Sequence, residues 1–241
     1  ALRTCEHADQ DVVLIVKALR KEKYSAFCPD EVKAKDQADF ELYARNIITY
    51  LHEHARGNDS ADEFRRAAEA YKVYLDFFED SPAYADMAEN YAEALFSSHQ
   101  YLKAGRQYET LALRMDKADP GRQEKLSAAV TSYYHAIRNR EHLTYFETAY
   151  AREGLKSAGR LFAESYPGSP RVPDVRFNVA WVAYDAGDYD GAIAEFTRFV
   201  QDYPDGEASK AAVHMILDAY SLKEDYPGLI AFGNGVIRNA G

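Results

Sequence analysis

Residues 187–204, with the sequence GDYDGAIAEFTRFVQDYP, decide the fold of this chain. In this stretch the small residue Ala192 is followed by Phe196 and Phe199, and Pro204 ends the segment. Side chains three and four residues apart lie on one face of a helix. The small residue lets a neighbouring helix approach, the aromatic rings fill the space beside it, and the proline prevents the helix from continuing. The stretch therefore predicts a helix that packs against another helix and ends in a turn.

The same pattern recurs far away in the chain. Its members there, at the same spacing, are Ala70, Tyr74, Phe77 and Pro82. The prolines that end apolar-periodic stretches are Pro82, Pro120, Pro167 and Pro204, at separations of 38, 47 and 37 residues. A recurrence of this length is a sign of stacked helical units.

These residues resemble the tetratricopeptide repeat (TPR), a helix–turn–helix unit of 34 residues. Residues 173–206 match its consensus in full, through Ala180, Gly187, Tyr189, Ala192, Phe196 and Pro204. Residues 85–118 match through Ala92, Leu95, Tyr101, Ala104 and Tyr108. The resemblance implies an all-α fold with about eleven helices. It would be an α-solenoid of about five TPR-like helical hairpins in a right-handed superhelix.

The repeat spacing predicts an N-terminal helix and capping segment over residues 1–36, followed by a TPR-like array over residues 37–241. The predicted hairpins are 37–82, 85–118, 121–167, 173–206 and 207–241. The first carries an extra polar loop at 56–60, where Ser60 or Asp62 is placed to cap the next helix. The third carries a longer join at 138–144. In the last, Pro227 occupies a first-turn position that tolerates its missing N–H.

Composition excludes several classes of partner. The chain has 241 residues and a net charge of −10, with 16 basic and 23 acidic residues in 1–120 and 13 and 16 in 121–241. Phosphate binding needs clustered cations, so nucleic acid and anionic lipid are not expected partners. The longest aliphatic run, Val12–Val16, is far shorter than the ~20 residues of a membrane span. We therefore expect no direct membrane span.

No pattern of a catalytic or metal site stands out. The seven histidines are dispersed, and His52 and His54 are two residues apart, so on a helix they point in different directions. The run from Asp185 to Gly191 lacks two carboxylates that a calcium loop needs, and we interpret it as a turn with helix-capping acids. Gly233–Gly235 lacks the other parts of a dinucleotide loop. The sequence predicts no cofactor, no metal and no enzyme; a site built from groove carboxylates is the weakest hypothesis.

The chain has two cysteines, Cys5 and Cys28, which flank a predicted helix over residues 9–23. A disulfide would require both flanking segments to run back along a helix of roughly 22 Å. A disulfide and two unpaired thiols both stay open. The chain begins with Ala1 and carries no signal sequence, so its start does not report its compartment.

The resemblance also implies a binding surface, because the first helix of each TPR unit lines a concave groove. The positions carried over onto this chain are Asp86, Glu89, Glu93, Phe96, Asp174, Phe177, Trp181, Tyr184, Asp185, His214 and Asp218. Phe177, Trp181 and Tyr184 would form one aromatic stripe, which fits core packing as well as an aromatic platform for a partner. The family's peptide-carboxylate clamp uses Lys, Arg and Asn at groove positions, and none occurs at those assigned here. An acidic and aromatic groove favours a basic or apolar segment of another protein.

The first functional hypothesis is a non-catalytic protein–protein interaction scaffold. The run 187–206 is similar to repeats of bacterial envelope proteins: outer-membrane assembly lipoproteins, Tol-Pal-associated coordinators and gliding-motility complexes. This resemblance implies an adaptor in a cell-envelope complex, periplasmic or outer-membrane-associated in a Gram-negative bacterium; the alternative compartment is the cytoplasm.

The second hypothesis is a structural or oligomerisation domain of a larger TPR protein. Its groove would be filled by the chain's own flanking segments or by a second copy. The last unit lacks a polar capping helix, which repeat arrays usually need, so apolar surface near Leu229, Ile230 and Ile237 favours self-association or a larger parent protein.

Overall fold

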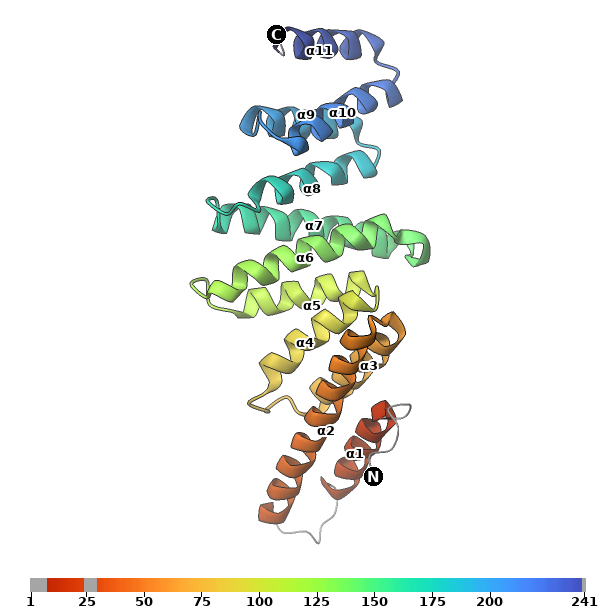
Figure 1. The fold of residues 1–241 in the computed structure, drawn as a ribbon, viewed down its shortest axis with the longest axis vertical. Helices are drawn as coiled ribbons and strands as arrows, with labels where there is room; N and C mark the ends of the chain where they lie inside the picture. The colour runs from red at the N-terminus through yellow and green to blue at the C-terminus, as the bar shows by residue number, and fades with distance from the viewer. Residues whose placement is uncertain (1–7, 24–29, 240–241) are drawn as a thin grey trace. The chain divides into compact units, whose positions relative to one another are not determined.

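The computed structural model describes residues 8–23 and 30–239 (Figure 1). In these ranges the chain forms eleven α-helices and one short 3₁₀ turn, without a β-strand. The prediction of an all-α fold with about eleven helices is confirmed. The chain divides into two compact units, Ala1–Arg114 and Met115–Gly241. No helix in the described ranges is both long enough and apolar enough to cross a bilayer.

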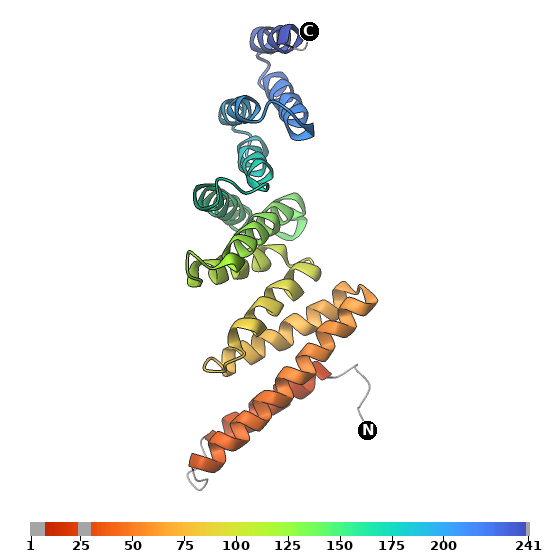
Figure 2. The same cartoon turned by 60° about the vertical axis from the view of Figure 1, so that its left-hand side comes forward.

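Unit 1 contains the first five helices, in which each helix packs against the next. They are α1 (Ala8–Lys23), α2 (Asp30–Asn58), α3 (Ala61–Phe77), α4 (Tyr84–Ser97) and α5 (Tyr101–Arg114). Helix α1 also packs against α3. The long helix α2 runs alongside α1 and covers it in the view of Figure 2. Fully buried tyrosines of α3, Tyr71 and Tyr74, lie in the centre of this core.

Unit 2 contains the remaining helices. They are α6 (Pro120–Arg138), η2 (Arg140–His142), α7 (Tyr145–Ser165), α8 (Val172–Asp185), α9 (Tyr189–Asp202), α10 (Glu207–Leu222) and α11 (Tyr226–Asn239). Each α-helix again packs against the next. In addition α6 contacts α8, and α8 contacts α10, so the first helices of successive hairpins lie side by side.

Four hairpins close with the same turn. Its central residue has a positive φ of 48° at Asp59, 62° at His99, 78° at Gly187 and 59° at Glu224. In each case the N–H of the following residue donates to the carbonyl five residues earlier, as at Gln100 to Leu95 and Asp188 to Ala183. This left-handed helix end satisfies carbonyls that the last helical turn would leave unpaired. The repeat is therefore visible in the backbone as well as in the sequence.

The aromatic pattern ends the second helix of three hairpins in the same way. The N–H groups of Phe78, Tyr166 and Tyr203 donate to the carbonyls of Tyr74, Phe162 and Phe199, respectively. Of the small and aromatic residues that define the pattern, Ala70, Tyr74, Ala192, Phe196 and Phe199 are buried and Phe77 is half-buried. Their burial confirms the packing that the sequence predicts.

Helix α2 is longer than the sequence indicates. It runs through Asn58, so the polar loop expected over 56–60 reduces to Asp59 and Ser60. Ser60 caps α3 as predicted, accepting a hydrogen bond from the N–H of Glu63. The boundary expected between residues 36 and 37 lies inside α2. Arg56 and Gly57 stay helical because the left-handed residue that stops the helix is Asp59.

The start of unit 2 also differs from the prediction. Pro120 was expected to end a helix, but it is the first residue of α6, with Asp119 as the N-cap. A proline fits there because the first helical N–H groups have no intrahelical partner. The longer join expected near 138–144 is present, and it contains η2 and a capping box between Thr144 and Glu147.

Two glycines let α7 approach its neighbours closely. A Cβ on Gly154 would lie 2.6 Å from the ring of Tyr133 on α6. A Cβ on Gly159 would lie 2.5 Å from Val179 on α8. Gly159 occupies the place that Phe196 has in α9, and Val179 fills the space that an aromatic ring would take there.

Candidate functional site

The three aromatic residues of the predicted stripe contact three different neighbours. Trp181 is only 8% exposed and packs edge-on against Tyr134 of α6, with 5.0 Å between the ring centroids. The guanidinium of Arg138 lies 5.8 Å from the Trp181 ring. Trp181 therefore joins α6 to α8 and keeps little surface for a partner.

The other two rings of the stripe contact helices later in the chain. Phe177 packs on Phe196 and Phe199 of α9, at centroid distances of 5.2 and 5.7 Å. The Tyr184 hydroxyl donates a hydrogen bond to the carboxylate of Asp218 on α10. That hydrogen bond raises the pKa of Tyr184 to about 12, because ionisation would place two negative charges together. The stripe thus joins hairpins inside unit 2.

Asp185 is buried and paired with two arginines. Its side chain is 7% exposed and forms ion pairs with Arg140 and with Arg152, the latter at 2.6 Å. Arg152 also donates to the backbone carbonyl of Asp185, at 3.0 Å. A buried carboxylate needs such partners, because leaving it unpaired would be costly. Asp185 thereby ties the end of α8 to α7 and η2.

The acids after Asp185 hold the start of α9 in place. Asp188 caps α9 by accepting from the N–H of Gly191, as the capping interpretation expects. Asp190 pairs with Lys223, at the turn between α10 and α11.

Within residues 8–23 and 30–239, no group of three or more His, Cys, Asp or Glu residues is arranged to hold a metal ion. Cys5 and Cys28, proposed as a disulfide or two thiols, lie outside the described residues.

In unit 1, Glu93 belongs to a network that sequence reasoning missed. Its carboxylate accepts from Arg56 at 2.9 Å and lies 3.6 Å from Nε2 of His52. His52 is buried, and its Nδ1 is 3.1 Å from the hydroxyl of Tyr71. The nearby His52 ring, together with Arg56, lowers the pKa of Glu93 to about 2. Burial raises the pKa of Tyr71.

The other predicted residues differ in exposure. Phe96 is half-buried and packs edge-on against Tyr101 of α5, with ring centroids 5.2 Å apart. The exposed members of the set are Asp86, Glu89, Asp174, His214 and Asp218. Assignment of the predicted set to partner binding stays a prediction.

Two of the exposed acids line pockets. At the start of α4, Asp86 lines a pocket of about 490 Å³ together with Ala83, Met87 and Asn90. Facing them are residues of α2: Arg45, Asn46, Thr49, Tyr50 and Glu53. We call this the unit 1 pocket.

The second pocket repeats the first in unit 2. At the start of α8, Asp174 lines a pocket of about 240 Å³ together with Arg171, Val175 and Asn178. Ser127, Val130 and Thr131 of α6 face them, and Arg171 donates to Ser127 Oγ at 3.1 Å. We call this the unit 2 pocket.

The two pockets use the same places in the repeat. Counted back from the left-handed turn residues, His99 and Gly187, the four lining residues at α4 and at α8 fall at identical positions. Each pocket therefore has an exposed aspartate and, one helical turn later, an asparagine on the same helix face. Residue-by-residue carry-over of the family's groove positions included the aspartates and omitted the asparagines.

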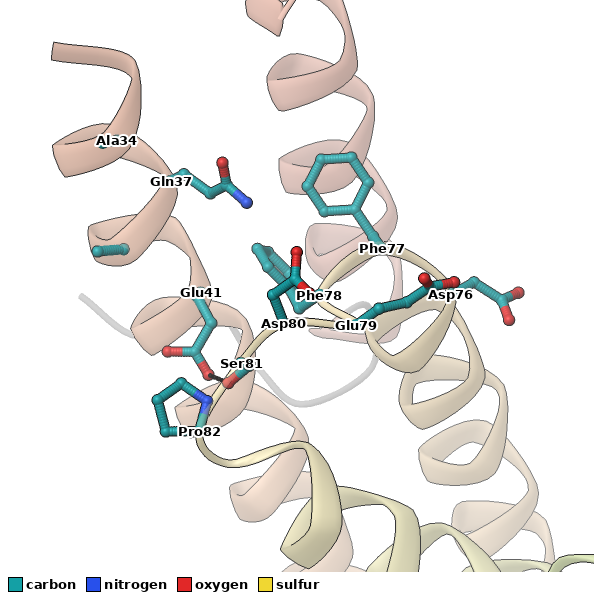
Figure 3. Close-up of a pocket in the computed structure, with 11 residues that line it drawn as sticks. Ala34, Gln37, Glu41, Asp76, Phe77, Phe78, Glu79, Asp80, Ser81 and Pro82 are labelled. Atoms are coloured by element: carbon teal, nitrogen blue, oxygen red, sulfur yellow. Dashed lines mark hydrogen bonds between the residues drawn. The ribbon is translucent and has the colours of Figure 1, made fainter. Parts of the chain in front are cut away.

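A third pocket, of about 700 Å³, lies in unit 1 between α2 and the α3–α4 turn (Figure 3). Its wall includes Glu41, which accepts hydrogen bonds from Tyr74 and from Ser81, the latter at 3.1 Å. Burial, followed by the bond with Glu41, raises the pKa of Tyr74 to about 12. These hydrogen bonds join α2, α3 and the following turn. The carboxylate of Glu41 therefore has a structural role.

Comparisons with known proteins bear on the fold. No protein-family model and no curated protein matches the chain. Among solved structures, a kinesin light chain-like protein of Podosopora anserina with nearly identical TPR-like repeats is 15% identical. The alignment covers 81% of this chain and 94% of that one, with a TM-score of 0.50. A single-substitution variant of that protein has the same identity and coverage, with a TM-score of 0.49.

The fold is a TPR-like helical repeat. The left-handed turns and the aromatic helix ends that recur along this chain support the assignment. In the TPR-like description, α2 and α4 are first helices of their hairpins in unit 1, and α6, α8 and α10 are first helices in unit 2. The unit 1 and unit 2 pockets thus both lie between consecutive first helices.

Proposed function

We propose that this chain is a non-catalytic scaffold whose unit 1 pocket and unit 2 pocket each bind an extended segment of another protein. The observation that carries the proposal is that both pockets are lined from the same four repeat positions. In each pocket an aspartate and an asparagine lie on the same face of one helix, and the Asn90 amide also contacts the hydroxyl of Tyr71. An asparagine amide donates and accepts, so it matches a backbone peptide group, which also does both.

The aspartates define the chemistry of the partner. Asp86 and Asp174 are exposed, and the chain carries a net charge of −10. A partner segment with Lys or Arg spaced between apolar residues would place its cations at these carboxylates. In the unit 1 pocket the apolar residues would lie against Tyr50, which is 54% exposed. Such charge complementarity increases the association rate and the selectivity more than the affinity.

A peptide array tests this proposal. Fluorescently labelled protein is applied to immobilised peptides of random sequence in which single Lys or Arg residues are present or absent. The wild type should retain peptides that contain Lys or Arg, and Asp86→Asn/Asp174→Asn should lose that preference. Asn90→Ala/Asn178→Ala should weaken binding to all retained peptides, because the amides would contact the backbone.

A matched control separates the pockets from the overall charge. Asp39→Asn/Asp205→Asn removes one exposed aspartate from each unit outside the two pockets. This variant should keep the wild-type preference. If Asp39→Asn/Asp205→Asn lost the preference for Lys and Arg as fully as Asp86→Asn/Asp174→Asn, the net charge alone would select the peptides. That result would contradict the proposal.

The cellular setting belongs to the same proposal. We infer an adaptor in a bacterial cell-envelope complex, periplasmic or outer-membrane-associated, from the style of the repeat at 187–206. An affinity pull-down from bacterial envelope extract checks this placement. A specific envelope protein retained by the wild type and lost with Asp86→Asn/Asp174→Asn is the expected result; retention by both forms contradicts the pocket assignment.

A further inference from the structure

The turns that lead into α4 and α8 have the same backbone but different side chains. Ser81 Oγ accepts from the N–H of Ala83 at 3.1 Å, and Ser169 Oγ accepts from the N–H of Arg171 at 3.3 Å. Ala83 and Arg171 are the N-cap residues of α4 and α8, and φ is −85° at both. At this position the unit 1 pocket therefore has a methyl group, and the unit 2 pocket has a guanidinium.

The side chain of Arg171 connects two walls of the unit 2 pocket. Its Nη1 donates to Ser127 Oγ on α6 at 3.1 Å, and both residues line the pocket. Ser127 is 8% exposed, so this hydrogen bond is partly shielded from water. On the same side, Gln123 of α6 donates to Ser169 Oγ at 2.8 Å and holds the turn beside α6. Arg171 is thus positioned to bridge α8 and α6.

The unit 1 pocket has no such bridge. Ala83 is too short to reach α2, and the basic residue of this pocket, Arg45, has its Nε 3.2 Å from Glu41, which lies outside the pocket. Asn46 corresponds to Ser127, because Asn46, Thr49 and Tyr50 of α2 have the spacing of Ser127, Val130 and Thr131 of α6. The unit 1 pocket measures about 490 Å³ and the unit 2 pocket about 240 Å³. The bridge therefore coincides with the smaller of the two pockets.

Arg171 also changes what a basic partner segment meets. The unit 2 pocket has one acidic and one basic residue, whereas the unit 1 pocket has two acidic and one basic residue. A bulky residue beside the partner's cation would have to displace Arg171 from Ser127, which costs a charge-assisted hydrogen bond. In the unit 1 pocket the same bulky residue would lie against the exposed ring of Tyr50.

We infer that Arg171 determines the specificity of the unit 2 pocket. This pocket selects basic segments that have small residues beside the Lys or Arg, whereas the unit 1 pocket also accepts bulky aromatic residues there. The inference rests on the proposed peptide binding and assigns a different class of segment to each pocket.

Fluorescence anisotropy with two short peptides tests the inference. In both peptides the central residue is Lys; it is flanked by Ala in one (the Ala peptide) and by Trp in the other (the Trp peptide). Asp174→Asn leaves the unit 1 pocket to bind the Lys, and should bind the Trp peptide at least as tightly as the Ala peptide. Asp86→Asn leaves the unit 2 pocket, and should bind the Ala peptide about tenfold more tightly, the factor that one lost charge-assisted hydrogen bond gives.

Two substitutions in the Asp86→Asn background separate the bridge from the charge. Arg171→Ala should abolish the preference for the Ala peptide, and alanine is compatible with this N-cap because Ala83 has the same φ. Ser127→Ala removes the acceptor and keeps the cation, and should also abolish the preference. The matched control Arg160→Ala removes another exposed arginine of unit 2 that lines neither pocket, and should keep it.

The reciprocal variant transfers the bridge to unit 1. In the Asp174→Asn background, Ala83→Arg should introduce the preference for the Ala peptide, since Asn46 has an amide oxygen that can accept from a guanidinium. Equal binding of both peptides by Asp86→Asn overturns the inference, and so does a preference that survives Arg171→Ala; in both cases the proposed function stands. If the wild type binds neither peptide, the proposed function fails and this inference fails with it.

Discussion

At the scale of single residues, several acids predicted to face a partner hold the protein together. Asp185 is enclosed by Arg140 and Arg152, and Glu93 lies between Arg56 and His52. The repeat position of an acidic residue predicts the helix face on which it lies. Its ion pairs depend on which basic residues the neighbouring helices place beside it. These cations come from residues 33 to 45 positions away in sequence, so the pairs could not be predicted from local spacing.

Glu93 makes a pH-dependent contribution to stability. The pKa of its carboxyl falls from 4.5 to about 2 in the folded chain, with the nearby His52 ring as the main lowering cause and Arg56 next. A lowered pKa stabilises the fold above pH 4.5, and this stabilisation disappears as the pH falls toward 2. At a side chain that is 41% exposed, solvent screening reduces the contribution to about 1 kcal/mol.

Glu93→Gln should therefore lower the free energy of unfolding at pH 7 by about 1 kcal/mol. The difference from the wild type should shrink as the pH is reduced from 4.5 to 2. Urea denaturation followed by circular dichroism at several pH values measures it. Glu53→Gln is the control, because Glu53 also pairs with Arg56 but is 59% exposed. A Glu93→Gln difference that stays constant down to pH 2 would contradict the assignment.

Trp181 illustrates another limit of residue-level prediction. Its place on the first helix followed from the repeat spacing, and the sequence left core packing and a partner platform open. The structure brings Tyr134 and Arg138 of α6 onto the ring. The burial of Trp181 depends on how closely α6 and α8 pack. The spacing of residues along either helix does not predict this distance.

At the scale of helices, the turns were the most predictable feature. The bend residue of the best-matching unit, Gly187, has the positive φ that glycine tolerates, and His99 and Glu224 adopt the same conformation at the same repeat position. The lengths of α2 and of the α6–α7 join were less predictable. In α2 a polar composition suggested a loop, but the helix continues until the left-handed residue, Asp59.

The shared turn predicts opposite effects of two glycine substitutions. Glu224→Gly should raise the free energy of unfolding by about 0.5–1 kcal/mol, because glycine adopts a positive φ without a steric penalty. Gly187→Ala should lower it by about 1 kcal/mol for the same reason. Thermal denaturation of both variants measures these changes. Equal destabilisation by both substitutions would show that side-chain contacts of Glu224, not backbone conformation, dominate at this turn.

At the scale of the whole chain, the division into two units has a measurable consequence. In a repeat protein each helix depends mainly on its neighbours, so damage to one hairpin should remain in its own unit. Ala192 is fully buried on α9, next to the aromatic rings that the repeat pattern places there. The position is thus suited to a local test.

Ala192→Trp should destabilise unit 2 by about 1–3 kcal/mol or more through overpacking. Hydrogen exchange followed by mass spectrometry should show faster exchange of amides in α8, α9 and α10. The amides of α2, α3 and α4 should keep their wild-type rates. An unchanged melting temperature would contradict the repeat spacing assigned to residues 173–206, and equally faster exchange in both units would contradict their independence.

Helix pairing between neighbours in sequence has a consequence for the speed of folding. Within each unit the helices pack on the next helix or the next but one, so few contacts require the closure of long loops. Chains dominated by local contacts have a low contact order, and small helical bundles with such contacts fold in microseconds to milliseconds. Any hairpin closed by the left-handed turn can act as a nucleus from which structure spreads to its neighbours. Refolding should thus begin at more than one place along this chain.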